Sequence, residues 1–111
     1  MEPKKEILMS GGLSNSFASS RTARVLGYAK NLIVVENRGG GSGVAYLIDA
    51  TPDLENSIAP WVNIHSGVVL SSGDTKAHRL EYPWDAIRVQ GKNLGASFSA
   101  SVVVWCNRDP R

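Results

Sequence analysis

The chain has 111 residues, of which 42% are hydrophobic and 20% charged, and its formal net charge is +2. These values exclude a disordered chain and predict one domain with a single modest core, and so small a charge does not favour nucleic acid as a partner. The single cysteine, Cys106, excludes an internal disulfide, so the fold does not depend on an oxidising compartment. No apolar run has the length of a signal peptide or a transmembrane helix, so we expect no membrane partner.

Residues 1–24 are predicted to lie outside the core as an extended or flexible N-terminal arm, and residues 25–111 to form a β-sandwich domain. The stretch from Gly11 to Ser20 is small, polar and glycine-rich, and it buries too little apolar surface to order itself. Two interpretations stay open: a floppy terminus, or an arm that orders on a neighbouring subunit. In the second, the interface residues of the arm are Leu13, Phe17, Arg21 and Arg24.

The rest of the chain alternates short apolar runs with turn residues, a pattern typical of all-β folds. In residues 44–49, Tyr46 and Ile48 share one face of the predicted strand. Residues 51–60 contain two prolines and predict a loop, and residues 66–67 predict a turn. Further strands are predicted over 24–37, 61–65, 68–70, 76–82 and 84–90.

The last strand is predicted over residues 96–106. One parity, from Phe98 to Cys106, is apolar and faces the core, whereas the other begins as a serine ladder and ends with Val103 and Trp105. About seven or eight short strands at this spacing predict a sandwich rather than a βαβ fold. The expected fold is therefore an all-β, small antiparallel β-sandwich that is jelly-roll-like.

No residue pattern points to catalysis, so we expect no enzyme, cofactor, metal or small-molecule substrate. The two histidines, His65 and His78, lack the tight spacing of metal ligands. Serine is abundant without a Gly-x-Ser-x-Gly motif. Cys106 falls on the core parity, where a thiol behaves as a small hydrophobe, and the acidic residues within 49–55 are typical of a solvated loop.

Tryptophan points to a binding surface. Trp84 and Trp105 fall on outward parities, and Trp and Arg are enriched at binding hot spots. We therefore predict interface anchors at Trp84 and Trp105, with Val103 and Arg108 beside Trp105. Trp61 is expected to cover one end of the core, which is also the alternative for the other two tryptophans.

The layout of residues 44–108 resembles small jelly-roll modules of phage virion proteins. It begins with the strand Ala-Tyr-Leu-Ile-Asp and an acidic loop, and continues with Trp-Val-Asn-Ile, Val-Val-Leu-Ser-Ser-Gly, Tyr-Pro-Trp-Asp-Ala-Ile-Arg-Val and the final strand. With its size and its basic, glycine-rich N-terminal segment, the whole chain resembles the capsid decoration (cement or staple) proteins of epsilon15-like short-tailed bacteriophages.

This resemblance implies a non-enzymatic virion structural protein on the outer capsid surface, made in the host cytoplasm. Its partners would be the major capsid protein and a second copy of itself in a homodimer. It would staple adjacent capsid subunits and stabilise the shell against the pressure of packaged DNA. No catalytic residue carries over, and the arm over residues 1–24 would be the bridging element.

Two other functions stay open as alternatives. A carbohydrate-binding β-sandwich module would stack sugars on exposed tryptophans such as Trp84 and Trp105. A single-stranded nucleic-acid binder would need a basic groove lined with aromatic residues. The weak net charge and the lack of Lys and Arg in residues 39–75 argue against that groove, so we expect no nucleic-acid partner.

Overall fold

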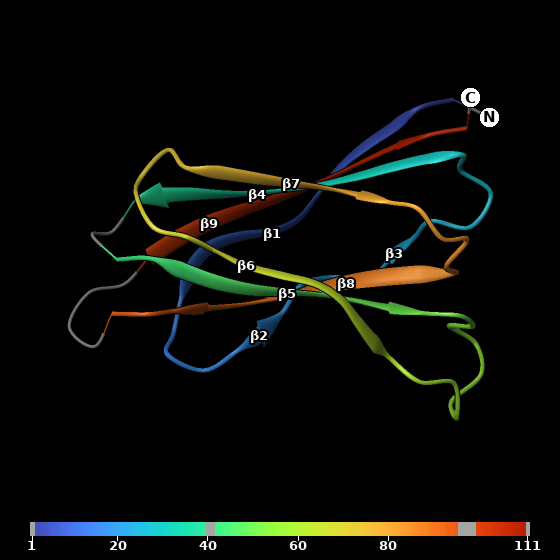
Figure 1. Cartoon of the computed structure of the whole chain (residues 1–111), viewed down its shortest axis with the longest axis horizontal. Helices are drawn as coiled ribbons and strands as arrows, with labels where there is room; N and C mark the ends of the chain where they lie inside the picture. Colours follow the sequence, from blue (N-terminus) through green and yellow to red (C-terminus); the bar gives the residue numbers. More distant parts are fainter. Residues whose placement is uncertain (1, 40–41, 96–99, 111) are drawn as a thin grey trace.

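The computed structural model describes residues 2–39, 42–95 and 100–110. These residues form two antiparallel sheets packed as a sandwich, without a helix, which confirms the predicted fold class (Figure 1). Consequently no helix in the described part of the chain is long and apolar enough to cross a membrane. The strands are β1 (Lys4–Leu13), β2 (Ala18–Ser19), β3 (Ala23–Arg24), β4 (Lys30–Gly39), β5 (Val44–Thr51), β6 (Val62–Val69), β7 (Thr75–Leu80), β8 (Ala86–Asn93) and β9 (Ala100–Asp109).

The four-stranded sheet has the order β1-β9-β4-β7, and the five-stranded sheet has the order β2-β8-β5-β6 with β3 also paired to β8. Alternate side chains of the central strands meet between the sheets, as the period of two predicts. The fully buried residues include Ile33, Val35, Tyr46, Ile48, Ile87, Val89, Val102 and Val104. Burying each such aliphatic side chain stabilises the fold by about 1.5–3 kcal/mol.

The last strand has the predicted two-faced character. Ala100, Val102, Val104 and Cys106 point into the core, and each is at most 1% exposed. β9 lies between β1 and β4 and continues to Asp109, beyond the predicted end. The predicted segment 96–99, with Phe98, lies outside the described residues.

The N-terminal segment differs from the expected arm. β1 is an edge strand of the four-stranded sheet, paired with β9 over its whole length, and it places Leu8 and Leu13 in the core. The polar, glycine-rich composition did not predict this strand, because its order comes from backbone hydrogen bonds to β9. Leu8 and Leu13 add the contacts with the core. Expecting residues 1–24 to stay outside the core was therefore wrong for β1.

β6 also differs from expectation, because it is one continuous strand through the predicted turn at residues 66–67. Gly67 does not form a turn; it allows the Tyr46 side chain to lie close to the β6 backbone. A Cβ atom at this position would lie 2.5 Å from the hydroxyl oxygen of Tyr46. The glycine therefore leaves room for the Tyr46 side chain, which reaches across from β5.

Candidate interaction surfaces

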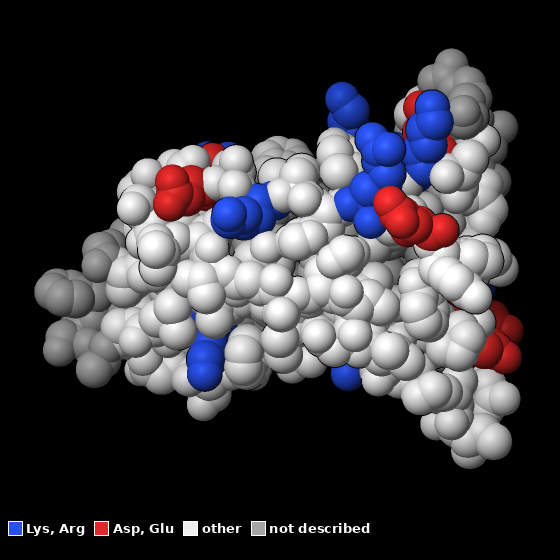
Figure 2. Space-filling model, in the orientation of Figure 1, with Lys and Arg blue, Asp and Glu red and all other residues white. Residues whose placement is uncertain are grey.

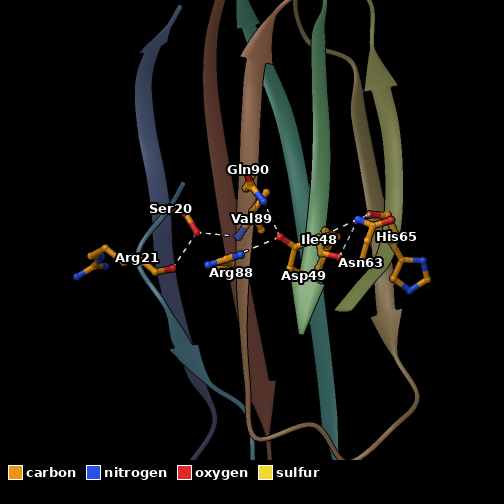
Figure 3. Close-up of polar contacts among 9 residues, drawn as sticks. All are labelled: Ser20, Arg21, Ile48, Asp49, Asn63, His65, Arg88, Val89 and Gln90. Carbon is orange, nitrogen blue, oxygen red and sulfur yellow. Dashed lines mark hydrogen bonds and ion pairs between the residues drawn. The ribbon is translucent and has the colours of Figure 1, made fainter. Parts of the chain in front are cut away.

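One side of the sandwich is closed by residues 18–24. β2 and β3 pair with β8, and the Val89 amide donates to the Ser20 hydroxyl at 2.9 Å. Arg21 covers the edge of β1, since its backbone amide donates to the Leu8 carbonyl at 3.1 Å and its guanidinium donates to the Ile7 carbonyl at 2.6 Å. Figure 3 shows Ser20 and Arg21 beyond β8, on the side away from Asp49.

The opposite side ends in β6 and β7, and no strand of the described chain continues either sheet there. The two edges differ in charge. β7 carries Lys76 and Arg79, whereas no Lys, Arg, Asp or Glu stands between Glu55 and Asp74, so β6 has none. Charged side chains are a common protection of free strand edges against unwanted pairing. β7 has this protection and β6 lacks it, and in Figure 2 the band over β6 is almost uncoloured.

Exposed apolar side chains gather around β6. Of the nine large hydrophobic residues that are exposed in the described chain, four lie in the stretch 58–70: Ile58, Val62, Val68 and Leu70. A bulge at Ile64 interrupts the pairing of β6 with β5, so the regular part of the edge is residues 65–69. This segment, called the β6 edge below, is the least protected strand edge of the sandwich.

A polar network fixes the outer face of the five-stranded sheet next to this edge (Figure 3). The Asp49 carboxylate accepts hydrogen bonds from Gln90 Nε2 at 2.6 Å, Arg88 Nε at 3.3 Å and Asn63 Nδ2 at 3.3 Å. Its side chain is only 8% exposed. Both carboxylate oxygens are engaged, so Asp49 holds β5, β8 and β6 together and is poorly placed to take a proton from a substrate.

The same network braces the bulge of β6. The Asn63 amide also donates to the backbone carbonyl of His65 at 3.1 Å. The Arg88 guanidinium lies 4.3 Å from the ring centroid of Trp61, a cation–π contact at the start of β6. Trp61 is half-buried, with the Arg88 guanidinium over its ring, and it covers the end of the sheet where β6 begins.

A histidine pair that sequence spacing did not suggest joins the two open edges. The rings of His65 on β6 and His78 on β7 stack at 4.6 Å, and His78 Nε2 lies 2.5 Å from the Tyr46 hydroxyl. Burial lowers the pKa of His78, with His65 and Lys76 adding to the effect, and burial raises the pKa of Tyr46. The residues are far apart in sequence, and only the strand order brings them together.

Three of the predicted interface residues are buried. Leu13 and Val103 are 7% and 9% exposed. Arg108 is 4% exposed; it pairs with Glu6 at 2.6 Å and donates to the Arg24 carbonyl at 2.5 Å. Leu13 belongs to the hydrophobic core, and the contacts of Arg108 lie within the subunit.

The other predicted interface residues lie on different elements. Phe17 is 39% exposed and has the Lys92 ammonium 4.8 Å from its ring. Arg21 and Arg24 pair with Glu6 at 3.5 Å and Glu55 at 3.0 Å. Trp84 packs against the core before β8, and Trp105 is half-buried on the outer face of β9. Of the predicted set, Arg21 and Arg108 meet at Glu6, and Arg108 also contacts the Arg24 carbonyl.

Comparisons with known proteins give fold similarity only. No family model and no curated protein matches the chain. One similar structure comes from Bacillus endospore appendages, described as a novel family of disulfide-linked pili; it has a TM-score of 0.60 and 10% identity, over 96% of this chain and 85% of that one. Another is the PBSX exported protein XepA, with a TM-score of 0.61 and 17% identity, over 96% of this chain and 37% of that one.

The predicted identity as a capsid decoration protein is wrong. The matching structures reported above are an endospore appendage protein and XepA, and neither supports a role on a phage capsid. The resemblance rested on size, strand spacing and a glycine-rich start, which many small β-sandwiches share. The predicted staple function is therefore wrong as well, and the expected capsid partner no longer has a resemblance to support it.

Proposed function

We propose that this chain is a structural, non-enzymatic subunit that associates with copies of itself through the β6 edge. The observation that carries the proposal is the asymmetry of the sandwich. Residues 18–24 close one side, whereas the other side presents an uncharged strand edge flanked by exposed Val62, Val68 and Leu70. A free edge of this kind pairs readily with a strand of another chain.

Charge favours a second copy as the partner at this edge. Antiparallel pairing of β6 with β6 of another subunit places no like charges opposite one another, because the strand has no Lys, Arg, Asp or Glu. The same pairing of β7 would bring Lys76 and Arg79 of both copies together. The expected product is a two-fold symmetric dimer with a continuous sheet.

The β6 edge is also held ready for pairing. Asn63 bonds to Asp49 and to the His65 carbonyl, and Asp49 is in turn bonded to β8. A strand that is already rigid loses less conformational entropy when it binds. The polar network on the outer face therefore supports assembly, which is a use for Asp49 other than catalysis.

The fold similarity to a pilus protein supports a structural role, with one difference in chemistry. Those appendages are disulfide-linked pili. This chain has one cysteine, Cys106, which is fully buried, and burial raises its pKa to about 11. Because a buried thiol of this kind is unreactive, we propose that the contacts between copies are non-covalent.

Hydrogen–deuterium exchange at low and high protein concentration tests the proposal. Amides of residues 65–69 should exchange more slowly at the concentration where the mass rises above that of a monomer. Residues 75–80 of β7 are the internal control, since this edge also lies open. Association without a change in residues 65–69, or with equal protection of both edges, would show that the β6 edge is not the contact.

A further inference from the structure

We propose that the loop between β5 and β6 of one copy inserts Ile58 into a cation-rimmed cavity on a second copy. The inference rests on the proposed function, because it adds a second contact to the pairing of β6 edges. The loop projects from the sandwich below the strands in Figure 1. The cavity is lined in part by residues 3–5 at the start of β1 and by residues 107–109 at the end of β9. In one molecule the loop does not line the cavity.

The loop presents Ile58 as a rigid apolar projection. Ile58 is 87% exposed, more than any other large hydrophobic residue described. Its amide donates to Asn56 Oδ1 at 3.1 Å, and the Ala59 amide donates to the Asn56 carbonyl at 3.0 Å. The Leu54 amide donates to Asp85 at 2.7 Å and anchors the loop to the sandwich. Burying this isoleucine in a partner would contribute favourable free energy to the contact, and an ordered loop loses less conformational entropy on binding.

The loop is also acidic. Asp53 and Glu55 are its charged residues, and no Lys or Arg occurs in residues 39–75. Glu55 pairs with Arg24 at 3.0 Å. Asp53 is exposed and makes no ion pair within the described chain. Its Oδ1 accepts a hydrogen bond from the Glu55 amide at 3.2 Å. The projection therefore combines an apolar side chain with a carboxylate that makes no ion pair in the described chain.

The cavity has the complementary character. Its volume is about 440 Å³, and Leu32 and Leu80 contribute apolar surface. Asp109 is the single carboxylate among the described residues that line it. Four cations also line it without an ion pair in the described chain: Lys4, Lys5, Lys30 and Arg79. An apolar floor inside a cationic rim fits an acidic loop that carries an isoleucine.

Polar groups around the cavity lack partners. Within the described residues, the buried side-chain atoms without a hydrogen bond are Asn31 Oδ1, Asn107 Oδ1 and Arg108 Nε. All three residues line this cavity. Buried polar atoms are rarely left unpaired in folded proteins, and their gathering at one place indicates a site whose partner comes from outside the subunit.

We propose a heterologous contact, in which the loop of each copy enters the cavity of the next copy and two copies do not exchange loops reciprocally. Each copy that inserts its loop keeps a free cavity, and the next copy keeps a free loop, so such contacts extend into rings or filaments. Combined with pairing of β6 edges, the contact would link dimers into longer assemblies.

Mixing two variants tests this contact, with Ser66→Lys in both to suppress β6 pairing. Ile58→Asp removes the projection, and Arg79→Glu reverses a cavity charge; both side chains are exposed, so the fold should persist, which circular dichroism checks. The Ser66→Lys protein alone should form chains by light scattering, and each double variant should associate at least tenfold more weakly. Mixed, the two variants should form a one-to-one complex that does not grow, because one intact loop meets one intact cavity.

Charge exchange provides a second readout. Asp53→Lys should restore association when it is combined with Arg79→Glu on the same chain. A Ser66→Lys protein that stays monomeric, or chains that Ile58→Asp leaves unchanged, would overturn the loop contact. Neither result would affect pairing at the β6 edge, which the exchange experiment measures separately.

Discussion

Tyr46 and His78 share a hydrogen bond of 2.5 Å that joins β5 of the five-stranded sheet to β7 of the four-stranded sheet. The ring of His65, on β6, stacks on His78 at 4.6 Å. The open side of the sandwich is thus held together by side chains, whereas the closed side is held by backbone pairing through residues 18–24. The stability of the open side should therefore depend on pH and on the space around Tyr46.

The lowered pKa of His78 predicts that acid destabilises the fold. Above the unfolded value of 6.5, histidine is neutral in both states and the Tyr46 bond is intact. As the pH falls below that value, the unfolded chain takes up a proton that the folded chain resists, so the free energy of unfolding decreases until the folded pKa is passed. Urea unfolding at about pH 7.5 and about pH 5 should show this decrease, and His78→Asn should reduce it. An unchanged pH dependence in that variant would mean that His78 does not titrate this way.

Gly67→Ala should destabilise the protein by about 1–3 kcal/mol through overpacking. The new Cβ would lie 2.5 Å from the Tyr46 hydroxyl oxygen and 2.8 Å from its Cζ, so the tyrosine would have to leave His78. Gly12→Ala on β1 is the matched control, because its Cβ would meet nothing closer than 4.0 Å. Chemical denaturation of both variants measures the difference; equal stabilities would refute the tight contact.

Glu6→Gln should lower the free energy of unfolding by about 3 kcal/mol, because it leaves the charge of Arg108 buried without its partner. Glu36→Gln is the control, because the Glu6 and Glu36 side chains are almost equally exposed, at 25% and 24%. Their partners differ: Arg108, which pairs with Glu6, is 3% exposed, whereas Arg38, which pairs with Glu36, is 50% exposed. A surface pair contributes about 1 kcal/mol or less. Thermal or urea unfolding compares them, and similar losses would argue against a special role for Arg108.

The Cys106 thiol should react with an aromatic disulfide reagent only after unfolding. The thiol is fully buried, and burial raises its pKa to about 11. In the native protein the reagent therefore cannot reach the sulfur, and the sulfur is not ionised to the reactive thiolate. The absorbance of the released thiol gives the rate with and without denaturant. Rapid reaction of the native protein would contradict its burial and reopen covalent linkage between copies.

The sequence was sufficient for the fold class and for the inward face of the last strand. Period-two alternation correctly grouped Tyr46 with Ile48 on one face and placed Val102 and Val104 on the core face, because buried side chains alternate in a two-layer sandwich. It misjudged β1, whose order comes from pairing with β9, and Gly67, whose role comes from contact with Tyr46. Both depend on neighbours that are distant in sequence.

The candidate surfaces were harder to predict for the same reason. Outward parity placed Trp105 on the outer face of the last strand, but it could not show that Arg108 reaches Glu6 or that Leu13 enters the core. The charge-free stretch between Glu55 and Asp74 was visible in the sequence. Its meaning depends on β6 being a free edge, which only the strand order reveals.

The most direct test of assembly through the β6 edge is sedimentation velocity of the wild-type protein, Ser66→Lys and Thr75→Lys over a concentration series. Ser66 lies within the β6 edge and Thr75 on β7, and both are exposed. The wild-type protein and Thr75→Lys should dimerise alike, and Ser66→Lys should weaken dimerisation at least tenfold, about 1.4 kcal/mol. A wild-type protein that is monomeric at every concentration, or equal effects of the two lysines, would contradict the proposal.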